Sequence, residues 1–139
     1  MRTRVTVLAV ALAVLCLGLA RAGDAKKDRT LLKGTWIGEH NDKKITLQFA
    51  AGKFTIEIGE EGDVVTGSFK LHPDKKPKAI DFKIEKGKKH RGKSALGIYE
   101  LSGTTLKLCL NGPGREQRPE QLAGDGGEIV LITFERKKD

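Results

Sequence analysis

Residues 44–58 read KITLQFAAGKFTIEI, and this stretch decides the fold class. Its apolar residues recur at every second position on either side of a glycine-containing connection, AAGK (50–53). Such alternation is typical of two β-strands joined by a tight hairpin, with one dry face and one wet face. A sheet of this kind is antiparallel, because parallel sheets are usually buried on both faces. The stretch therefore predicts an antiparallel all-β protein.

The same period of two continues through most of the chain beyond residue 33. We expect eight strands joined by connections rich in turn-forming residues: 34–40, 44–49, 53–58, 64–71, 78–85, 94–101, 104–110 and 128–136. Eight antiparallel strands with short connections favour a small up-and-down barrel of the lipocalin type, whose closure leaves no exposed edge. A two-sheet β-sandwich is the alternative, because the strand count alone does not separate the two architectures.

The first residues match the three-part pattern of a secretory signal peptide. A basic start precedes the apolar run VTVLAVALAVLCLGLA, and the small residues of ARA at 20–22 fit a signal-peptidase site. The apolar run is shorter than the roughly 20 residues that a membrane-spanning helix needs. We expect a signal peptide over residues 1–22, a linker with a short helical turn over 23–32, and the barrel domain over 33–137. This organisation predicts a secreted or periplasmic protein with no transmembrane segment after cleavage.

The chain is basic, with 26 Lys and Arg against 18 Asp and Glu and a formal net charge of +8. Part of that excess belongs to the leader, which contains Arg2, Arg4 and Arg21. Cys16 also lies in the leader, so the mature chain keeps Cys109 alone and forms no internal disulfide. A secreted domain without a disulfide depends on its apolar core for stability.

The segment GTWIGEH (34–40) contains the only tryptophan, with a glycine two residues before it and another two after it. Glycines in a strand allow a sharp bend and a close backbone approach, so the indole of Trp36 is free to fold across one end of a barrel. In a closed barrel the last strand lies beside the first. That arrangement brings Arg136 to the indole for a cation–π contact of about 0.5–2 kcal/mol. The alternative is an ordinary core aromatic and a solvated Arg136.

These two residues resemble the closed end of lipocalin and calycin barrels, in which a tryptophan on the first strand packs against a late arginine. A longer resemblance links the chain to the uncharacterised secreted domain family expanded in Planctomycetes. It rests on four blocks in order: LLKGTW (31–36), PKAIDF (77–82), GIYELSGTTLKLCL (97–110) and RP (118–119). Thr104 departs from that family, which has an aspartate in this turn. Because no activity is established for the family, the resemblance implies fold and export but no function.

Large apolar residues are expected to point into the barrel: Phe49, Phe54, Phe69, Phe82, Ile98 and Leu108. An eight-stranded barrel has just enough room for such side chains or for one small ligand. Two interpretations therefore remain open, a fully packed core and a pocket for a small apolar molecule.

The one long connection reads NGPGREQRPEQLAGDGGE (111–128), and connections of this length are usually functional lids or mobile loops. Arg115 and Arg118 give it planar guanidinium groups suited to a carboxylate or a phosphate. We hypothesise that this connection caps the open end of the barrel and that Arg118 pairs with Asp81. The alternative is that Asp81 faces solvent, as its position two residues before Lys83 indicates.

A basic tip, KGKKHRGK (86–93), is the third candidate feature, and its cations are Lys86, Lys88, Lys89, Arg91 and Lys93. Clustered cations attract an anionic polysaccharide or an anionic lipid surface. Nucleic acid is disfavoured, because the chain is expected to be exported and no aromatic residue is interleaved with the lysines to stack on bases. The alternative is a solvated turn.

Catalytic and metal-binding patterns are weak in this sequence. Cys109 lies in the apolar segment LKLCL without the nearby histidine that would favour a reactive thiolate. The histidines show no metal-binding spacing and no cofactor motif is present, so we expect no catalytic residue, metal site or cofactor. The sequence predicts an exported, non-enzymatic binding or interaction module. The alternative is a hydrolytic or thiol-dependent enzyme that uses Cys109 or the Arg115–Arg118 loop.

Overall fold

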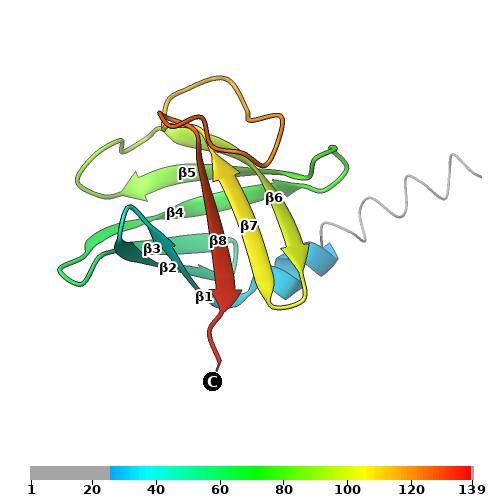
Figure 1. Cartoon of the computed structure of the whole chain (residues 1–139), viewed down its shortest axis with the longest axis horizontal. Coiled ribbons are helices and arrows are strands. Elements are labelled where there is room, and N and C mark those ends of the chain that lie inside the picture. Colours follow the sequence, from blue (N-terminus) through cyan, green and yellow to red (C-terminus); the bar gives the residue numbers. More distant parts are fainter. Residues whose placement is uncertain (1–25, 139) are drawn as a thin grey trace, which may run out of the picture.

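The alternating segments form eight strands, each paired with its neighbours in the sequence (Figure 1). They are β1 Gly34–His40, β2 Lys43–Ala50, β3 Lys53–Ile58, β4 Asp63–His72, β5 Ala79–Lys86, β6 Ser94–Ser102, β7 Thr105–Leu110 and β8 Val130–Arg136. Strand β8 returns to pair with β1, so the sheet closes into an antiparallel barrel. The predicted up-and-down barrel is confirmed, and the sandwich alternative is excluded.

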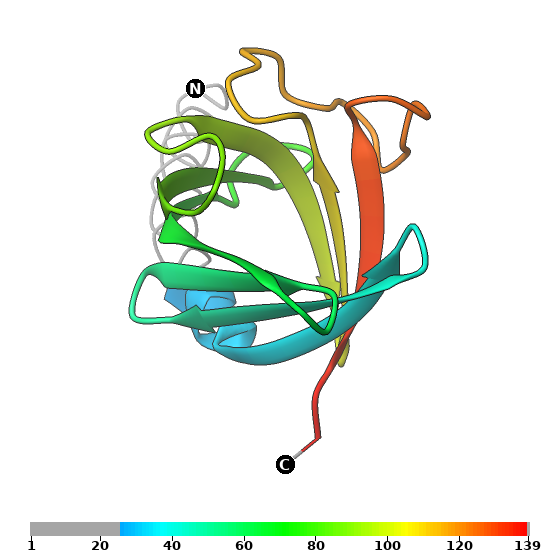
Figure 2. The same ribbon diagram turned by 90° about the vertical axis from the view of Figure 1, so that its left-hand side faces the viewer.

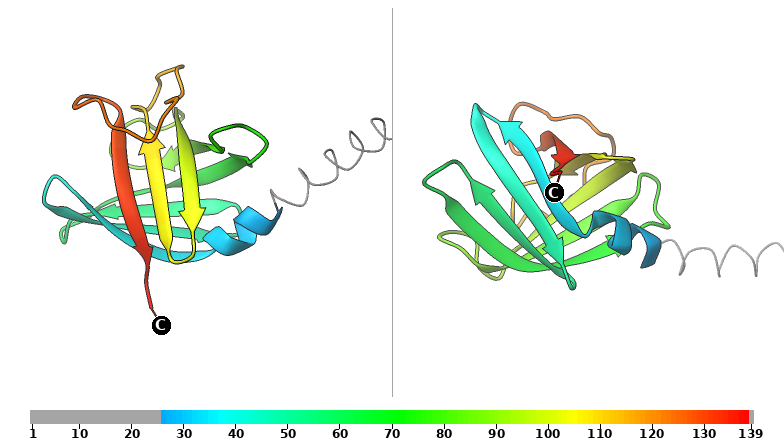
Figure 3. Two further views of the ribbon diagram at one scale, coloured as in Figure 1. Left: turned by 45° about the vertical axis from the view of Figure 1, so that its right-hand side comes forward. Right: turned by 90° about the horizontal axis from the view of Figure 1, so that it is seen from below.

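The structure is a computed structural model, and it describes residues 26–138. The predicted signal peptide over residues 1–22 and the first residues of the linker lie outside the described part. Within that part, no helix is long and apolar enough to span a membrane. One short helix is present, over residues 26–32, directly before β1 (Figure 3).

Strand alternation places one set of side chains inside the barrel. In β2, Ile45, Leu47 and Phe49 are buried, and the residues between them are more exposed. The hairpin register sets Phe49 opposite Phe54, so two large side chains share the inner face. Contributions of this kind from all eight strands build one interior core.

Two glycines allow the barrel to close and bend. Gly38 faces Phe134 across the β1–β8 seam, where a Cβ atom would lie 2.8 Å from the phenyl ring. At Gly67 a Cβ atom would lie only 1.8 Å from the carbonyl oxygen of Lys83, and the β4–β5 register shifts between Thr66 and Gly67. A shift of this kind is a β-bulge, which bends a strand and increases its twist. Side chains larger than glycine would hold both strand pairs apart.

The barrel has two unlike ends. We call the end that carries the helix the closed end, and it also holds the β2–β3, β4–β5 and β6–β7 connections (Figure 1). The opposite end, here the open end, carries the remaining connections: 41–42, 59–62, 87–93 and 111–129. Figure 2 looks onto the open end and shows the ring of strands, with the helix behind it.

Candidate functional site

Trp36 and Arg136 seal the closed end together with the short helix. Trp36 is fully buried, and its indole N–H donates a hydrogen bond of 2.8 Å to the carbonyl of Leu32. The guanidinium carbon of Arg136 lies 4.3 Å from the centre of the indole ring. Arg136 also donates hydrogen bonds to the carbonyls of Lys33, at 2.8 Å, and Leu31. The last carbonyls of a helix have no hydrogen-bond partner within the helix, and here two side chains from the barrel donate hydrogen bonds to them.

A buried carboxylate fastens the other end of the same helix. Asp28 is 5% exposed, accepts a hydrogen bond of 2.6 Å from the hydroxyl of Tyr99, and pairs with Lys78 at 3.0 Å. Sequence reasoning missed this group, because Tyr99 and Asp28 are 71 residues apart and Asp28 stands in a charged segment that reads as solvated. The helix is therefore held at both of its ends, by the barrel wall and by the seam.

The open end contains an apolar pocket of about 310 Å³, which we call the open-end pocket. Its apolar walls come mainly from β3, β4 and β5, namely Phe54, Ile56, Ile58, Val65, Phe82 and Ile84. Leu110 at the end of β7 and Pro113 complete the apolar lining. Drug-sized ligand pockets measure about 300–1,000 Å³, so this volume is at the small end of that range.

Four phenylalanine rings occupy the middle of the barrel. Phe54 and Phe82 meet edge to face at 4.9 Å, Phe82 approaches Phe49 at 6.1 Å, and Phe49 meets Phe69 at 4.8 Å. Phe54 and Phe82 border the open-end pocket, whereas Phe49 and Phe69 border a second pocket of about 490 Å³ beside the helix. Leu108 is buried in the same core. The barrel is thus filled by packed rings at this depth and has an apolar recess at its open end.

Ile98 does not point into the barrel, and this corrects its predicted place in the lining. Its neighbour Tyr99 belongs to the interior core, so alternation along β6 turns Ile98 to the outer face. It pairs there with Cys109 of β7, and both are almost fully buried. The segment SALGIYEL has apolar residues at both parities, so a period of two did not decide which of Ile98 and Tyr99 faces inward.

Charged residues surround the mouth of the open-end pocket. Lys88, Lys89 and His90 from the connection 87–93 line the pocket, as does Asp63 from β4. Lys88 pairs with Asp63 at 2.8 Å. The hydrogen bond from Lys88 lowers the pKa of Asp63, and the same bond raises the pKa of Lys88. His90 is a pocket residue that sequence reasoning overlooked, because only the lysines and arginines of the tip were counted.

The remaining cations of the predicted basic tip lie outside the pocket lining. Lys86, Arg91 and Lys93 are exposed on the same hairpin tip. The structure therefore divides the predicted cluster: Lys88 and Lys89 line the pocket, and the other three cations do not.

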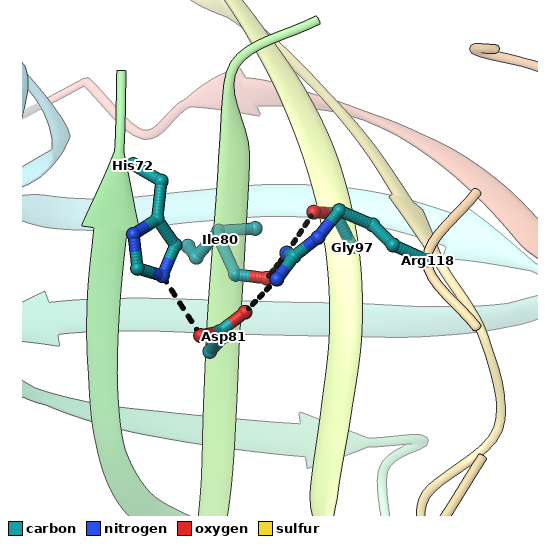
Figure 4. Close-up of polar contacts among 5 residues, drawn as sticks. All are labelled: His72, Ile80, Asp81, Gly97 and Arg118. Atoms are coloured by element: carbon teal, nitrogen blue, oxygen red, sulfur yellow. Dashed lines mark hydrogen bonds and ion pairs between the residues drawn. The ribbon is translucent and has the colours of Figure 1, made fainter. Parts of the chain in front are cut away.

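Asp81 and Arg118 form an ion pair of 2.6 Å on the outside of the barrel (Figure 4). Arg118 also donates to the carbonyls of Ile80 and Gly97, at 3.1 and 2.9 Å, and His72 lies 2.8 Å from the second oxygen of Asp81. Burial raises the pKa of Asp81, but hydrogen bonds from His72 and Arg118 outweigh it, and the pKa lies below its ordinary value. Asp81 therefore faces outward, as its parity indicates, and also pairs with Arg118.

The connection 111–129 does not cap the open end, which corrects the predicted lid. Arg118 fastens it to the outer side of β5 and β6, and the Cys109 thiol lies 3.6 Å from the carbonyls of Gln121 and Ala123. Within this connection, Pro113 alone lines the open-end pocket. In Figure 2 the connection lies outside the ring of strands. Loop length did not reveal this path, because partners from β5 and β6 determine it.

The groups proposed for catalysis are occupied in other ways. Burial raises the pKa of the Cys109 thiol, which favours the protonated, unreactive form. Arg115 forms an exposed ion pair with Glu128, and Arg118 is engaged as described. Among residues 26–138, no group of three or more His, Cys, Asp or Glu is placed to hold a metal ion.

Comparisons with known proteins add no further assignment. A scan against protein-family models, a search of curated proteins and a search of solved structures each found no match to this chain. The fold is consistent with a lipocalin-like barrel on its own topology, with a closed ring of eight antiparallel strands and an arginine stacked on the first-strand tryptophan.

Proposed function

We propose that the protein is an exported, non-enzymatic binding module that holds a small apolar molecule in the open-end pocket. The observation that carries this proposal is the almost wholly apolar wall of the open-end pocket, at the end of the barrel opposite Trp36 and Arg136. A recess with apolar walls and a few polar groups at its mouth is the usual form of a small-molecule site. The mouths of β-barrels are a preferred location for such sites.

Non-enzymatic binding accounts for the surrounding chemistry better than the alternative of a hydrolytic or thiol-dependent enzyme. The Cys109 thiol is protonated by preference and lies beneath the connection 111–129. Both arginines of that connection form ion pairs within the protein, so neither has a guanidinium group reserved for a substrate.

We also propose that the chain belongs to the secreted domain family expanded in Planctomycetes and is exported through its N-terminal leader. The support for membership is the order of the four sequence blocks, two of which contribute the buried Trp36 and Tyr99 to the barrel. The support for export is the three-part pattern of residues 1–22.

Fluorescence of N-phenyl-1-naphthylamine, a neutral apolar dye, tests the binding function. We expect saturable binding to the wild-type protein and at least about a tenfold loss in Ile56→Phe, because the larger ring fills the pocket. The matched control is Thr55→Phe, which places the same ring on the opposite face of β3.

The proposal fails if the wild-type protein does not bind this dye. It also fails if Ile56→Phe binds the dye as well as Thr55→Phe does, because the dye would then bind elsewhere.

A further inference from the structure

The mouth of the open-end pocket is positively charged on one side. Lys88, Lys89 and His90 all come from the connection 87–93 and all line the pocket. Lys88 is paired with Asp63, whereas no ion pair of Lys89 or His90 occurs within the described part of the chain. The charge of Lys89 nevertheless reaches the mouth, since it contributes to the lowered pKa of Asp63. An apolar pocket with an unpaired positive charge at its mouth suits a ligand that has an apolar part and a negatively charged part.

The connection that carries these cations has a defined backbone. Its two flanks are joined by hydrogen bonds from the Ile84 amide to the Lys93 carbonyl, at 2.9 Å, and from the Gly92 amide to the Ile84 carbonyl, at 2.8 Å. The Lys93 amide donates to the His90 carbonyl at 3.0 Å, and His90 has a positive φ of 66°. A residue held in this sparsely populated region indicates a tip whose conformation is imposed by its surroundings. The backbone that carries these groups is therefore held beside the mouth of the pocket.

We propose, on the basis of the binding function above, that the ligand is a free single-chain amphiphile with an anionic head. Its apolar chain enters the pocket between Ile56, Val65 and Ile84, and its head remains at the mouth beside Lys89 and His90. A charge-assisted hydrogen bond from Lys89 to a carboxylate, sulfonate or similar head is stronger than a bond between neutral groups, and the ring of His90 adds a second hydrogen-bonding group. The rings of Phe54 and Phe82 close the inner side of the pocket and limit the chain to a short one.

The other side of the mouth disfavours an anionic membrane surface as the partner. The connection 59–62 carries Glu60 and Glu61, which share a surface recess with Asp42 and Asp63 as well as with Lys43, Lys44 and Lys88. A bilayer would bring its negative charge close to all of these groups at once, so the carboxylates would oppose the attraction of the lysines. A single soluble head meets only the cations nearest the pocket. The mixed charge of the mouth therefore favours a free amphiphile.

Two dyes with nearly the same rings separate this proposal from simple apolar binding. The anionic 8-anilinonaphthalene-1-sulfonate is compared with neutral N-phenyl-1-naphthylamine at low ionic strength, with the wild-type protein. We expect the anionic dye to bind about three- to fivefold more tightly, the size of effect that one exposed ion pair supplies. In Lys89→Glu this preference is expected to disappear. Lys107→Glu, on the outer face of β7, changes the net charge equally and is expected to retain it.

The outcomes distinguish the two proposals. Equal affinity for both dyes in the wild-type protein, or a preference that Lys89→Glu does not change, overturns the anionic-head assignment and leaves the binding function intact. If Lys107→Glu also loses the preference for the anionic dye, the preference is due to net charge, and the anionic-head assignment is overturned. Failure of both dyes to bind removes the binding function itself. Cosedimentation with phosphatidylglycerol vesicles that persists at about 0.15 M salt would replace the free amphiphile by a membrane surface.

Discussion

The two ends of the barrel use the same kinds of residue in opposite ways. At the closed end, Asp28 is 5% exposed and Trp36 is fully buried, and each has its polar group bonded inside the protein. At the open end, the ion pair of Lys88 with Asp63 has side chains that are 81% and 58% exposed. Ile58 and Val64, beside that pair, are among the exposed large apolar residues.

The difference shows where the barrel gains its stability and where it stays accessible. Buried hydrogen bonds and packed rings contribute much more than exposed ion pairs, which are worth about 0–1 kcal/mol. The buried hydrogen bonds of Asp28 and Trp36 lie at the helix and the seam. The polar groups of Lys88 and Asp63 at the opposite end are exposed to solvent and do not need to be buried. An apolar pocket at the open end therefore costs the fold little.

The largest expected effect is at the closed end. Trp36→Ala removes the central ring, leaves a cavity, and deprives the Leu32 carbonyl of its donor. We expect it to lower the free energy of unfolding by about 3–5 kcal/mol. The open-end counterpart is Ile58→Ala, which is expected to cost less than about 1 kcal/mol because Ile58 is 37% exposed. Urea unfolding followed by far-UV circular dichroism measures both, and equal losses would contradict the contrast between the two ends.

The next largest effect compares two arginines of the connection 111–129. Arg118→Ala breaks the pair with Asp81 and two hydrogen bonds to strand carbonyls, so we expect a loss of about 1–3 kcal/mol. Arg115→Ala breaks only an exposed pair with Glu128 and is expected to cost much less than Arg118→Ala.

The same urea series decides this comparison. A loss in Arg115→Ala as large as that in Arg118→Ala would show that the two pairs anchor the connection equally, despite their different exposure.

The smallest effect is a pH dependence at Asp81. Its pKa is lowered in the folded protein from an ordinary value of 3.8, so the carboxylate contributes stability above that value and loses it as the pH falls further. Between about pH 5 and pH 2, the wild-type protein is expected to lose more free energy of unfolding than Asp81→Asn. Thermal unfolding at a series of pH values measures the difference. Parallel curves for the two proteins would show that the pair with Arg118 has no net effect on the titration.

Local sequence was sufficient for the strands but not for every side-chain direction. The alternation in β2 and β3 identifies the inward residues, because only one parity is apolar. In β6 both Ile98 and Tyr99 are apolar, since the connection 111–129 buries the outer face as well. A pattern of one strand cannot reveal a second covering layer that is contributed by a distant segment.

The Arg118–Asp81 pair shows the same limit at the candidate site. The two residue types and the interruption of an apolar strand suggested the pair, and both parity and pairing hold in the structure. The predicted path of the connection was wrong, however, because it depends on hydrogen bonds to the carbonyls of Ile80 and Gly97. Every residue has a backbone carbonyl, whatever the sequence. Backbone partners leave no signature in the sequence.

The sequence by itself determined the all-β class and the positions of the eight strands, because alternation and turn chemistry act over neighbouring positions. Only the tertiary structure decided that Asp28 binds Tyr99, that the long connection runs outside the wall, and that Lys89 and His90 stand at the mouth of an apolar pocket. Each of those facts joins groups that are far apart in the chain. The distance in space between these groups depends on how the sheet closes and bends, and closure is a property of all eight strands together.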